Sequence, residues 1–172
     1  MAGGNGDMAG AAASAGAARR TVFRGVSELV LDAKGRLAMP ARYRDTLVER
    51  SEGRLVATVD RSDRCLLIYP LPDWEEIERK LMRLPTLNPQ ARRLQRLMVG
   101  HATDLELDSH GRVLVPPKLR EYAGLTRQAM LIGQGSRFEL WDEQHWNERR
   151  EAWLAAGEEA GDLPTELVQL SL

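Results

Sequence analysis

The chain has 172 residues, and its 24 lysine and arginine residues almost balance 25 aspartate and glutamate residues, for a formal net charge of −1. No apolar run reaches the ~18 residues that a membrane-spanning helix needs, which excludes a membrane span. The single cysteine, Cys65, excludes disulfides within the chain and cysteine-rich metal sites. It stands in a hydrophobic run, so we expect a buried, inert thiol in a reducing compartment.

Residues 1–21 are mostly alanine and glycine and contain no leucine, isoleucine or valine. Such a segment cannot bury enough apolar surface to offset the entropy lost on ordering, so we expect it to be disordered. The pair Arg19-Arg20 follows no apolar run, so the segment does not read as a signal peptide. We expect the folded part of the chain to begin near Val22.

One stretch of the chain occurs twice. Residues 30–44 and residues 106–120, called here the first and second copy, align without gaps at an offset of 76 residues. Six of the 15 aligned positions are identical, where chance would give about one. The identical pairs are Leu31/Leu107, Asp32/Asp108, Gly35/Gly111, Arg36/Arg112, Pro40/Pro116 and Arg44/Arg120. We interpret the match as an internal duplication.

Each copy predicts a strand, a tight turn, a second strand and a short helix. The aspartate can accept a hydrogen bond from the backbone two residues on, and the glycine adopts a positive φ at no steric cost. The proline that follows, Pro40 in the first copy, ends the strand and suits the first turn of a helix. The turn therefore projects Lys34 and Arg36 in the first copy, and His110 and Arg112 in the second, from a rigid hairpin.

The spacing Asp-x-x-x-Arg lets a carboxylate meet a guanidinium across the turn. Such a pair orients the arginine for bidentate recognition of a phosphate or of a guanine edge. For a single copy, the alternative reading is an ordinary hairpin with a solvated ion pair of little energetic value. Two copies, each with basic residues just downstream, favour the functional interpretation.

The other elements are predicted from periodicity and capping signals. Residues 55–59 and 65–69 predict one pair of strands, and residues 129–133 and 138–141 predict another. Three helices are predicted to begin at N-capping residues, which are Asp73 with Glu76 in a capping box, Asn88 before Pro89, and Asp142. Their apolar stripes need partners, and burial between subunits is a natural outcome.

Charge is distributed unevenly along the chain. Residues 19–44 hold seven basic groups against two acidic ones, and residues 142–172 hold eight acidic groups against two basic ones. A polarised molecule can present a basic face although its total charge is near zero. Arg92, Arg93 and Arg96 lie on the helix predicted after Asn88, and we interpret them as a solvated or intersubunit face rather than a nucleic-acid contact.

Six ordered motifs carry a resemblance to a known family. They are Phe23-Arg24-Gly25, Leu31-Asp32-x-Lys34-Gly35-Arg36, Pro40-x-Arg42-Tyr43-Arg44, Cys65-Leu66-Leu67-Ile68-Tyr69-Pro70-Leu71-Pro72-x-Trp74, Gly100-His101-Ala102 and Phe138-Glu139-Leu140-Trp141-Asp142. With these motifs the chain resembles the MraZ family, bacterial transcription regulators encoded at the start of the division and cell-wall gene cluster. The resemblance covers residues 22–154.

The resemblance implies an α+β fold made of two tandem, pseudo-symmetric AbrB-like swapped-hairpin halves, similar to a double-split β-barrel, with flanking helices. We accordingly divide the chain into four parts. They are an Ala/Gly-rich extension at 1–21, a first half with two helices at 22–99, a second half with a C-terminal helix at 100–156, and an acidic tail at 157–172 that we expect to be flexible.

The resemblance also implies a function for the chain. It implies a cytoplasmic, nucleoid-associated regulator that needs no cofactor and binds double-stranded promoter DNA at short, G-rich direct repeats, including the promoter of its own gene. It implies assembly into a ring-shaped homo-oligomer, an octamer or a dodecamer. The family's signature motifs fall on Asp32/Arg36 and Asp108/Arg112. The second copy has His110 in place of Lys34, so the two halves need not contact DNA equally.

We predict DNA contacts from both copies. Arg36 is the first candidate for reading base edges, and Arg112 is its counterpart in the second copy. Phosphate contacts, which position a protein without specifying sequence, are predicted for Lys34, Arg42, Arg44 and Lys118. Asp32 and Asp108 are predicted to orient the arginines.

The sequence leaves two alternative classes of function. A metal-dependent hydrolase could use Asp32, Asp108, His101 and His110, but the spacing of these residues matches no zinc pattern and no catalytic fingerprint occurs. An arginine four residues after each aspartate also favours ionised, structural carboxylates. We therefore expect neither catalysis nor a metal site. A ring-forming scaffold that acts through protein partners, without DNA readout, is the other alternative.

Overall fold

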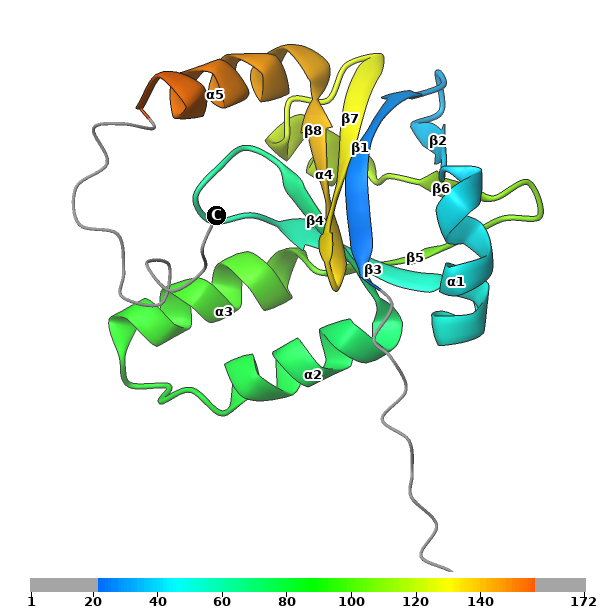
Figure 1. Ribbon diagram of the computed structural model, residues 1–172. Helices are drawn as coiled ribbons and strands as arrows, with labels where there is room; N and C mark the ends of the chain where they lie inside the picture. Colours follow the sequence, from blue (N-terminus) through cyan, green and yellow to red (C-terminus); the bar gives the residue numbers. More distant parts are fainter. Residues whose placement is uncertain (1–21, 157–172) are drawn as a thin grey trace, which may run out of the picture.

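The computed structural model describes residues 22–156, so the predictions for residues 1–21 and for the tail at 157–172 lie outside it. The described residues form a mixed α and β fold (Figure 1). Its elements are β1 (Phe23–Val30), β2 (Arg36–Ala38), α1 (Ala41–Ser51), β3 (Arg54–Val59), β4 (Leu66–Pro70), α2 (Leu71–Met82), α3 (Pro89–His101), β5 (Thr103–Glu106), β6 (Arg112–Leu114), α4 (Pro117–Tyr122), β7 (Gln128–Gly135), β8 (Arg137–Asp142) and α5 (Glu143–Ala156). None of these helices is long and apolar enough to cross a membrane.

Six strands form one antiparallel sheet in the order β1-β7-β8-β4-β3-β5. The predicted strand pairs β3–β4 and β7–β8 are both present. β1 pairs with β7 along its whole length, and β5 pairs with β3. Each half of the chain therefore adds an edge strand to the hairpin of the other half, and the two halves share one sheet.

The two remaining strands, β2 and β6, form a separate two-stranded antiparallel ribbon. The hairpin predicted within each copy is therefore wrong. The strands on either side of the first turn, β1 and β2, pair with β7 and β6 of the other half instead of with each other. Alternation along a strand shows which side chains are buried, but it does not show which strand lies beside it.

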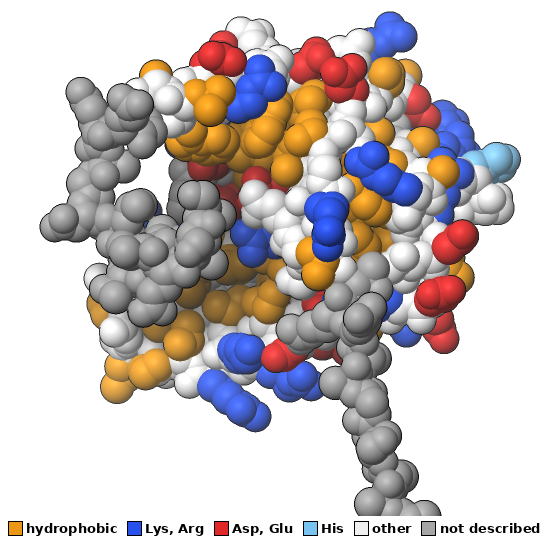
Figure 2. Space-filling model, viewed as in Figure 1, with side chains coloured by type: hydrophobic (Ala, Val, Ile, Leu, Met, Phe, Trp, Pro, Cys, Tyr) orange, Lys and Arg blue, Asp and Glu red, His pale blue; other side chains and the backbone are white. Residues whose placement is uncertain are grey.

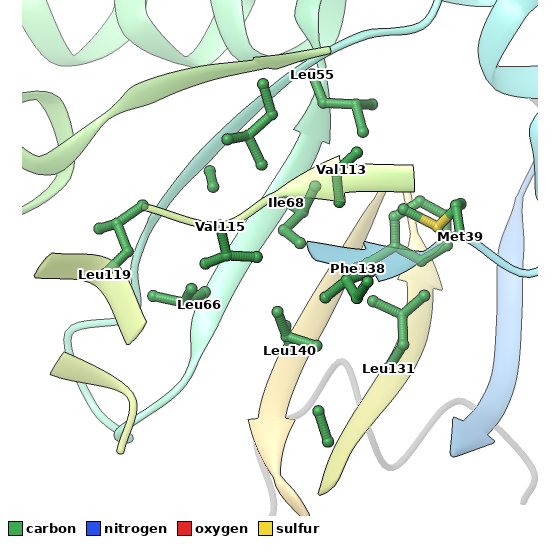
Figure 3. Close-up of a cluster of buried hydrophobic side chains, with 14 of the residues drawn as sticks. Met39, Leu55, Leu66, Ile68, Val113, Val115, Leu119, Leu131, Phe138 and Leu140 are labelled. Carbon is green, nitrogen blue, oxygen red and sulfur yellow. The ribbon is translucent and has the colours of Figure 1, made fainter. Parts of the chain in front are cut away.

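The main core is filled from both halves (Figure 3). Leu37 of β2 and Val113 of β6 are 1% exposed and belong to the same cluster as Leu66, Ile68, Leu131 and Leu140 of the large sheet. The ring of Phe138 lies 4.3 Å from that of Phe23 between centroids. Because each half contributes to one cluster, the ribbon is fixed on the sheet by residues from both halves of the chain.

Helices α2 and α3 cover a second hydrophobic cluster. It joins Val56, Leu67 and Tyr69 of β3 and β4 to Trp74 and Leu81 of α2, with Leu94 and Met98 of α3 packed against it. A third cluster contains Cys65, Met130, Ile132 and Trp141, with Trp146 of α5 packed against it. Cys65 is 1% exposed, which confirms the prediction of a buried thiol.

The helix starts bear out two of the three predicted caps. Asn88 accepts hydrogen bonds from the backbone N–H groups of Gln90 and Ala91, and Asp142 accepts from Gln144 and His145. Asp73 is not an N-cap, because α2 already begins at Leu71. Its Oδ1 accepts a hydrogen bond from Nη2 of Arg50 at 2.6 Å, an ion pair that sequence spacing could not reveal.

Candidate functional site

The first turn, residues 32–36, is held together by the Asp32 carboxylate. Its Oδ1 accepts hydrogen bonds from the backbone N–H groups of Lys34 and Arg36, both at 2.9 Å. Its Oδ2 accepts one from Nε of Arg36 at 2.7 Å. The backbone N–H of Gly35 donates to the Asp32 carbonyl, and Gly35 has a φ of +84°. One carboxylate thus shapes the turn and orients the arginine that leaves it.

The second turn, residues 108–112, repeats this geometry. Oδ1 of Asp108 accepts from the backbone N–H groups of His110 at 2.8 Å and Arg112 at 2.9 Å, and Oδ2 accepts from Nε of Arg112 at 2.9 Å. The backbone N–H of Gly111 donates to the Asp108 carbonyl, as in the first turn. The two copies found in the sequence therefore form the same set of hydrogen bonds in their turns.

Both carboxylates are stabilised in their ionised form. The backbone N–H of Arg36, followed by its side chain, lowers the pKa of Asp32 from 3.8 to about 2. The pKa of Asp108 is also lowered, chiefly by the backbone N–H of Arg112. Each carboxylate therefore stays charged at neutral pH and pairs with its arginine, which fits the predicted orienting role better than a role in proton transfer.

The two arginines lie on one face of the ribbon. Arg36 is opposite Leu114 and Arg112 is opposite Ala38, and directly opposed side chains in a sheet point to the same side. Leu37 and Val113 point the other way, into the core. The outward face of the ribbon therefore carries Arg36, Ala38, Leu114 and Arg112. The backbones of diagonal neighbours of this kind are about 7–8 Å apart, so the two arginines leave the same short ribbon on the same side.

This outward face is open to solvent. The side chains of Arg36 and Arg112 are each 33% exposed, and Leu114 is 53% exposed. Figure 2 shows Lys and Arg side chains, with a histidine, along the edge of the molecule where β2 and β6 lie in Figure 1. Within residues 22–156 the only side-chain hydrogen bond of each arginine is the one from Nε to its aspartate, so its two terminal amino groups have no protein partner.

The four residues predicted to contact phosphates differ in their exposure and in their contacts within the protein. Lys34 is exposed at the tip of the first turn, and Lys118 is exposed at the start of α4. Arg42 is exposed too, but its Nη2 donates to Ser27 of β1 at 2.7 Å and its guanidinium lies 4.7 Å from the ring centre of Tyr43. Arg44 is only half-exposed, and its Nε donates to the carbonyl of Met39 at 2.7 Å.

Three residues near the two turns were not predicted as site residues from the sequence. They are Arg120, Ala38 and Leu114. Arg120 is the counterpart of Arg44, and its Nε donates to the carbonyl of Val115 at 3.0 Å. The identical pair Arg44/Arg120 in the alignment was a signal for it. Ala38 and Leu114 are recognisable only once β2 is known to pair with β6, because their place on the ribbon depends on that register.

The residues considered for a metal site do not form a ligand group. His101 lies at the end of α3 with Nδ1 2.9 Å from the carbonyl of Leu97, and His110 lies in the second turn beside Ser109. Across residues 22–156, no three His, Cys, Asp or Glu side chains are placed together as they would be around a metal ion.

Comparisons with known proteins identify one matching family and several relatives of high sequence identity. A family model described as "MraZ protein, putative antitoxin-like" matches the chain twice, over residues 22–97 and 98–160. The transcriptional regulator MraZ of Halorhodospira halophila is 60% identical over 153 residues, which cover 88% of this chain and all of that protein. The proteins of the same name from Pseudomonas aeruginosa and Coxiella burnetii are 58% and 55% identical, again over 88% of this chain and their full length.

Proposed function

The chain belongs to the MraZ family, and from this premise we propose that it is a transcriptional regulator that binds double-stranded promoter DNA at short, G-rich direct repeats, including those before its own gene. The relatives at 55–60% identity are named transcriptional regulators, and the match covers their whole length. A regulator of this kind works in the cytoplasm, on the nucleoid.

The outward face of the ribbon carries this proposal. A two-stranded β-ribbon fits the major groove of B-DNA, and arginine makes bidentate hydrogen bonds to O6 and N7 of guanine. Arg36 and Arg112 stand on that face, each held by an ionised aspartate and each with terminal amino groups that have no partner within residues 22–156. We assign Arg36 and Arg112 to base-edge contacts, and Asp32 and Asp108 to orienting them.

We further propose that basic residues around this face contact DNA phosphates. Lys34 extends from the first turn and Lys118 from the start of α4, and both are exposed. Arg42 at the start of α1 is a third exposed cation, although it also binds Ser27. Arg44 packs against Gly111 of the second turn and its Nε donates to the carbonyl of Met39, so we do not include it. His110 replaces Lys34 in the second turn, so the first turn is expected to contribute more to binding.

The exchange of edge strands between the two halves supports a swapped-hairpin fold. β1 joins the β7–β8 hairpin and β5 joins the β3–β4 hairpin, as expected for two swapped-hairpin halves in one chain. We propose halves at 22–99 and 100–156 and assembly into a ring-shaped homo-oligomer. A single short ribbon reads few base pairs, so a ring would raise affinity by holding several ribbons near successive DNA repeats.

A salt titration tests the proposal. Two DNA fragments are compared, the promoter fragment immediately upstream of the protein's own gene and a scrambled fragment of the same composition. A DNA reader binds the promoter fragment more tightly, and log affinity falls steeply with log salt, by about 0.9 per phosphate neutralised. A fragment cut to one repeat should bind much more weakly. Equal affinity for one repeat and for several would contradict the ring mechanism, and absence of salt-dependent binding would favour a scaffold.

A further inference from the structure

Each turn glycine is covered by an arginine of the other copy. A Cβ placed on Gly35 in the first turn would lie 2.6 Å from both Cζ and Nε of Arg120 in the second copy. A Cβ placed on Gly111 in the second turn would lie 2.6 Å from Cδ of Arg44 in the first copy. Only glycine leaves room for this approach. The arginine fork therefore rests directly on the backbone of the opposite turn.

Hydrogen bonds link the same partners. The backbone N–H of Val115 donates to the carbonyl of Gly35 at 2.9 Å, and the carbonyl of Val115 accepts from Nε of Arg120 at 3.0 Å. Gly35 is thus held by the backbone of Val115, just after β6, on one side and by Arg120 on the other. The connection runs from one copy to the other, and none of it is visible in the spacing of residues along either copy.

The second turn has the mirror arrangement. The backbone N–H of Met39 donates to the carbonyl of Gly111 at 2.9 Å, and the carbonyl of Met39 accepts from Nε of Arg44 at 2.7 Å. A surface hollow beside each turn has the same crossed composition. One is lined by Asp32 and Arg120 among others, and the other by Asp108 and Arg44 among others.

We propose that Arg120 is a positioning residue for the first turn and Arg44 for the second, so that each DNA-facing turn is held by the arginine of the opposite copy. This inference rests on the proposed DNA-binding function. It gives Arg44 a role different from the phosphate contact predicted from sequence. It also means that Arg44, eight residues after Arg36 in the chain, supports Arg112 instead.

The geometry explains why an arginine is used. A guanidinium is planar, so it can lie flat on a glycine backbone while its Nε donates in the plane to a carbonyl. A lysine ammonium has no such plane. Because Nε of each arginine is already engaged, its fork has a fixed direction, and the turn beneath it is confined to one conformation. A confined turn presents its Asp–Arg pair already oriented, which lowers the entropy lost on binding.

Hydrogen exchange followed by mass spectrometry tests the crossed support without DNA. The variants are Arg120→Met and Arg44→Met, which keep the length of the side chain and remove the fork. Arg120→Met should speed amide exchange in residues 32–36 by about fivefold or more, as expected for the loss of one net hydrogen bond, and leave residues 108–112 unchanged. Arg44→Met should do the reverse. If each variant loosens its own copy, or neither turn, the proposal is overturned.

Two further variants complete the design. Arg64→Met is the control. Arg64 lies in the β3–β4 loop, outside both copies, and its Nε also donates to a backbone carbonyl, that of Tyr122. It should change exchange in neither turn. If a methionine variant does not fold, Arg120→Lys or Arg44→Lys takes its place, because lysine keeps the stem and the charge but lacks the planar fork. The same crossed pattern is expected, and its absence overturns the proposal in the same way.

The DNA arm uses the promoter and scrambled fragments. Arg120→Met should weaken promoter binding by about fivefold or more, and by a larger factor than Arg44→Met, because the first turn carries Lys34. If both variants bind the promoter fragment as tightly as the unaltered protein does, although the exchange pattern is crossed, the positioning role is overturned. If the unaltered protein does not distinguish the two fragments, the DNA-binding function fails, while the exchange pattern still decides whether the opposite arginine holds each turn.

Discussion

Asp32 binds Arg36 through both of its carboxylate oxygens, one to the backbone N–H at 2.9 Å and one to Nε at 2.7 Å. The first contact fixes where β2 begins, and the second fixes the direction of the guanidinium. Asp108 and Arg112 repeat the relationship at the other end of the ribbon. Turn shape and arginine direction are therefore set by the same carboxylate, and both should depend on its charge.

Replacing Asp32 with asparagine should make the first turn less stable in a pH-dependent way. The pKa of Asp32 is about 2 in the folded protein against an ordinary value of 3.8. A lowered pKa stabilises the fold fully above the unfolded value and less as pH falls through the folded value. The stability difference between the protein and Asp32→Asn should be constant above pH ~5 and be lost progressively toward pH ~1. Denaturant unfolding at several pH values measures it. A difference that grows on acidification would be inconsistent with this role.

Arg36→Ala and Lys34→Ala should fail differently on DNA. Loss of a bidentate guanine contact should weaken promoter binding by about 1–3 kcal/mol and leave the scrambled fragment much less affected. Loss of the Lys34 charge should weaken both fragments alike and reduce the log–log salt slope by about 1. Mobility shifts over a salt series measure both effects. Equal losses on the two fragments for Arg36→Ala would reduce Arg36 to a backbone contact.

Gly35→Ala should destabilise the fold more than Gly124→Ala does. Both glycines have positive φ, +84° and +62°, for which an alanine costs about 1–2 kcal/mol. Only Gly35 also meets Arg120, whereas nothing lies within 4 Å of a Cβ on Gly124. The excess should shrink when Gly35→Ala is made together with Arg120→Ala. Unfolding free energies from denaturant titration decide, and equal costs for the two glycines would show that Arg120 does not crowd Gly35.

Cys65 should be unreactive in the folded protein. Burial, followed by the nearby Glu139 carboxylate, raises the pKa of its thiol, and it is the thiolate that attacks alkylating reagents. Iodoacetamide at pH 8 should label Cys65 only after unfolding in denaturant, as followed by mass spectrometry. The unfolded chain serves as the control. Labelling of the folded protein at the rate of the unfolded chain would mean that the third hydrophobic cluster opens readily.

Local chemistry was predictable from sequence, and long-range pairing was not. The turn at Asp32 and the cap at Asn88 follow from residues within four positions, and the structure has both. The cap at Asp73 failed because its carboxylate is engaged by Arg50, 23 residues away in the chain. A local rule cannot register a partner that only the folded chain brings near.

The candidate site was predicted in part for the same reason. The duplication pointed to both Asp–Arg pairs, whose geometry depends on four neighbouring residues. The single outward face depends on the pairing of β2 with β6, and the contact of Arg120 with Gly35 depends on the exchange between copies. The duplication predicted a strand after each turn, but it gave no information on which strands meet.

The most direct test of the central claim compares two double variants of equal charge. Arg36→Ala/Arg112→Ala removes both arginines of the ribbon face, and Arg92→Ala/Arg96→Ala removes two exposed arginines of α3. Binding to the promoter and scrambled fragments is measured for each at the same salt concentration. The ribbon variant should no longer distinguish the fragments, whereas the α3 variant should keep its preference. Retained preference in the ribbon variant, or equal loss in both, would contradict DNA readout by the ribbon.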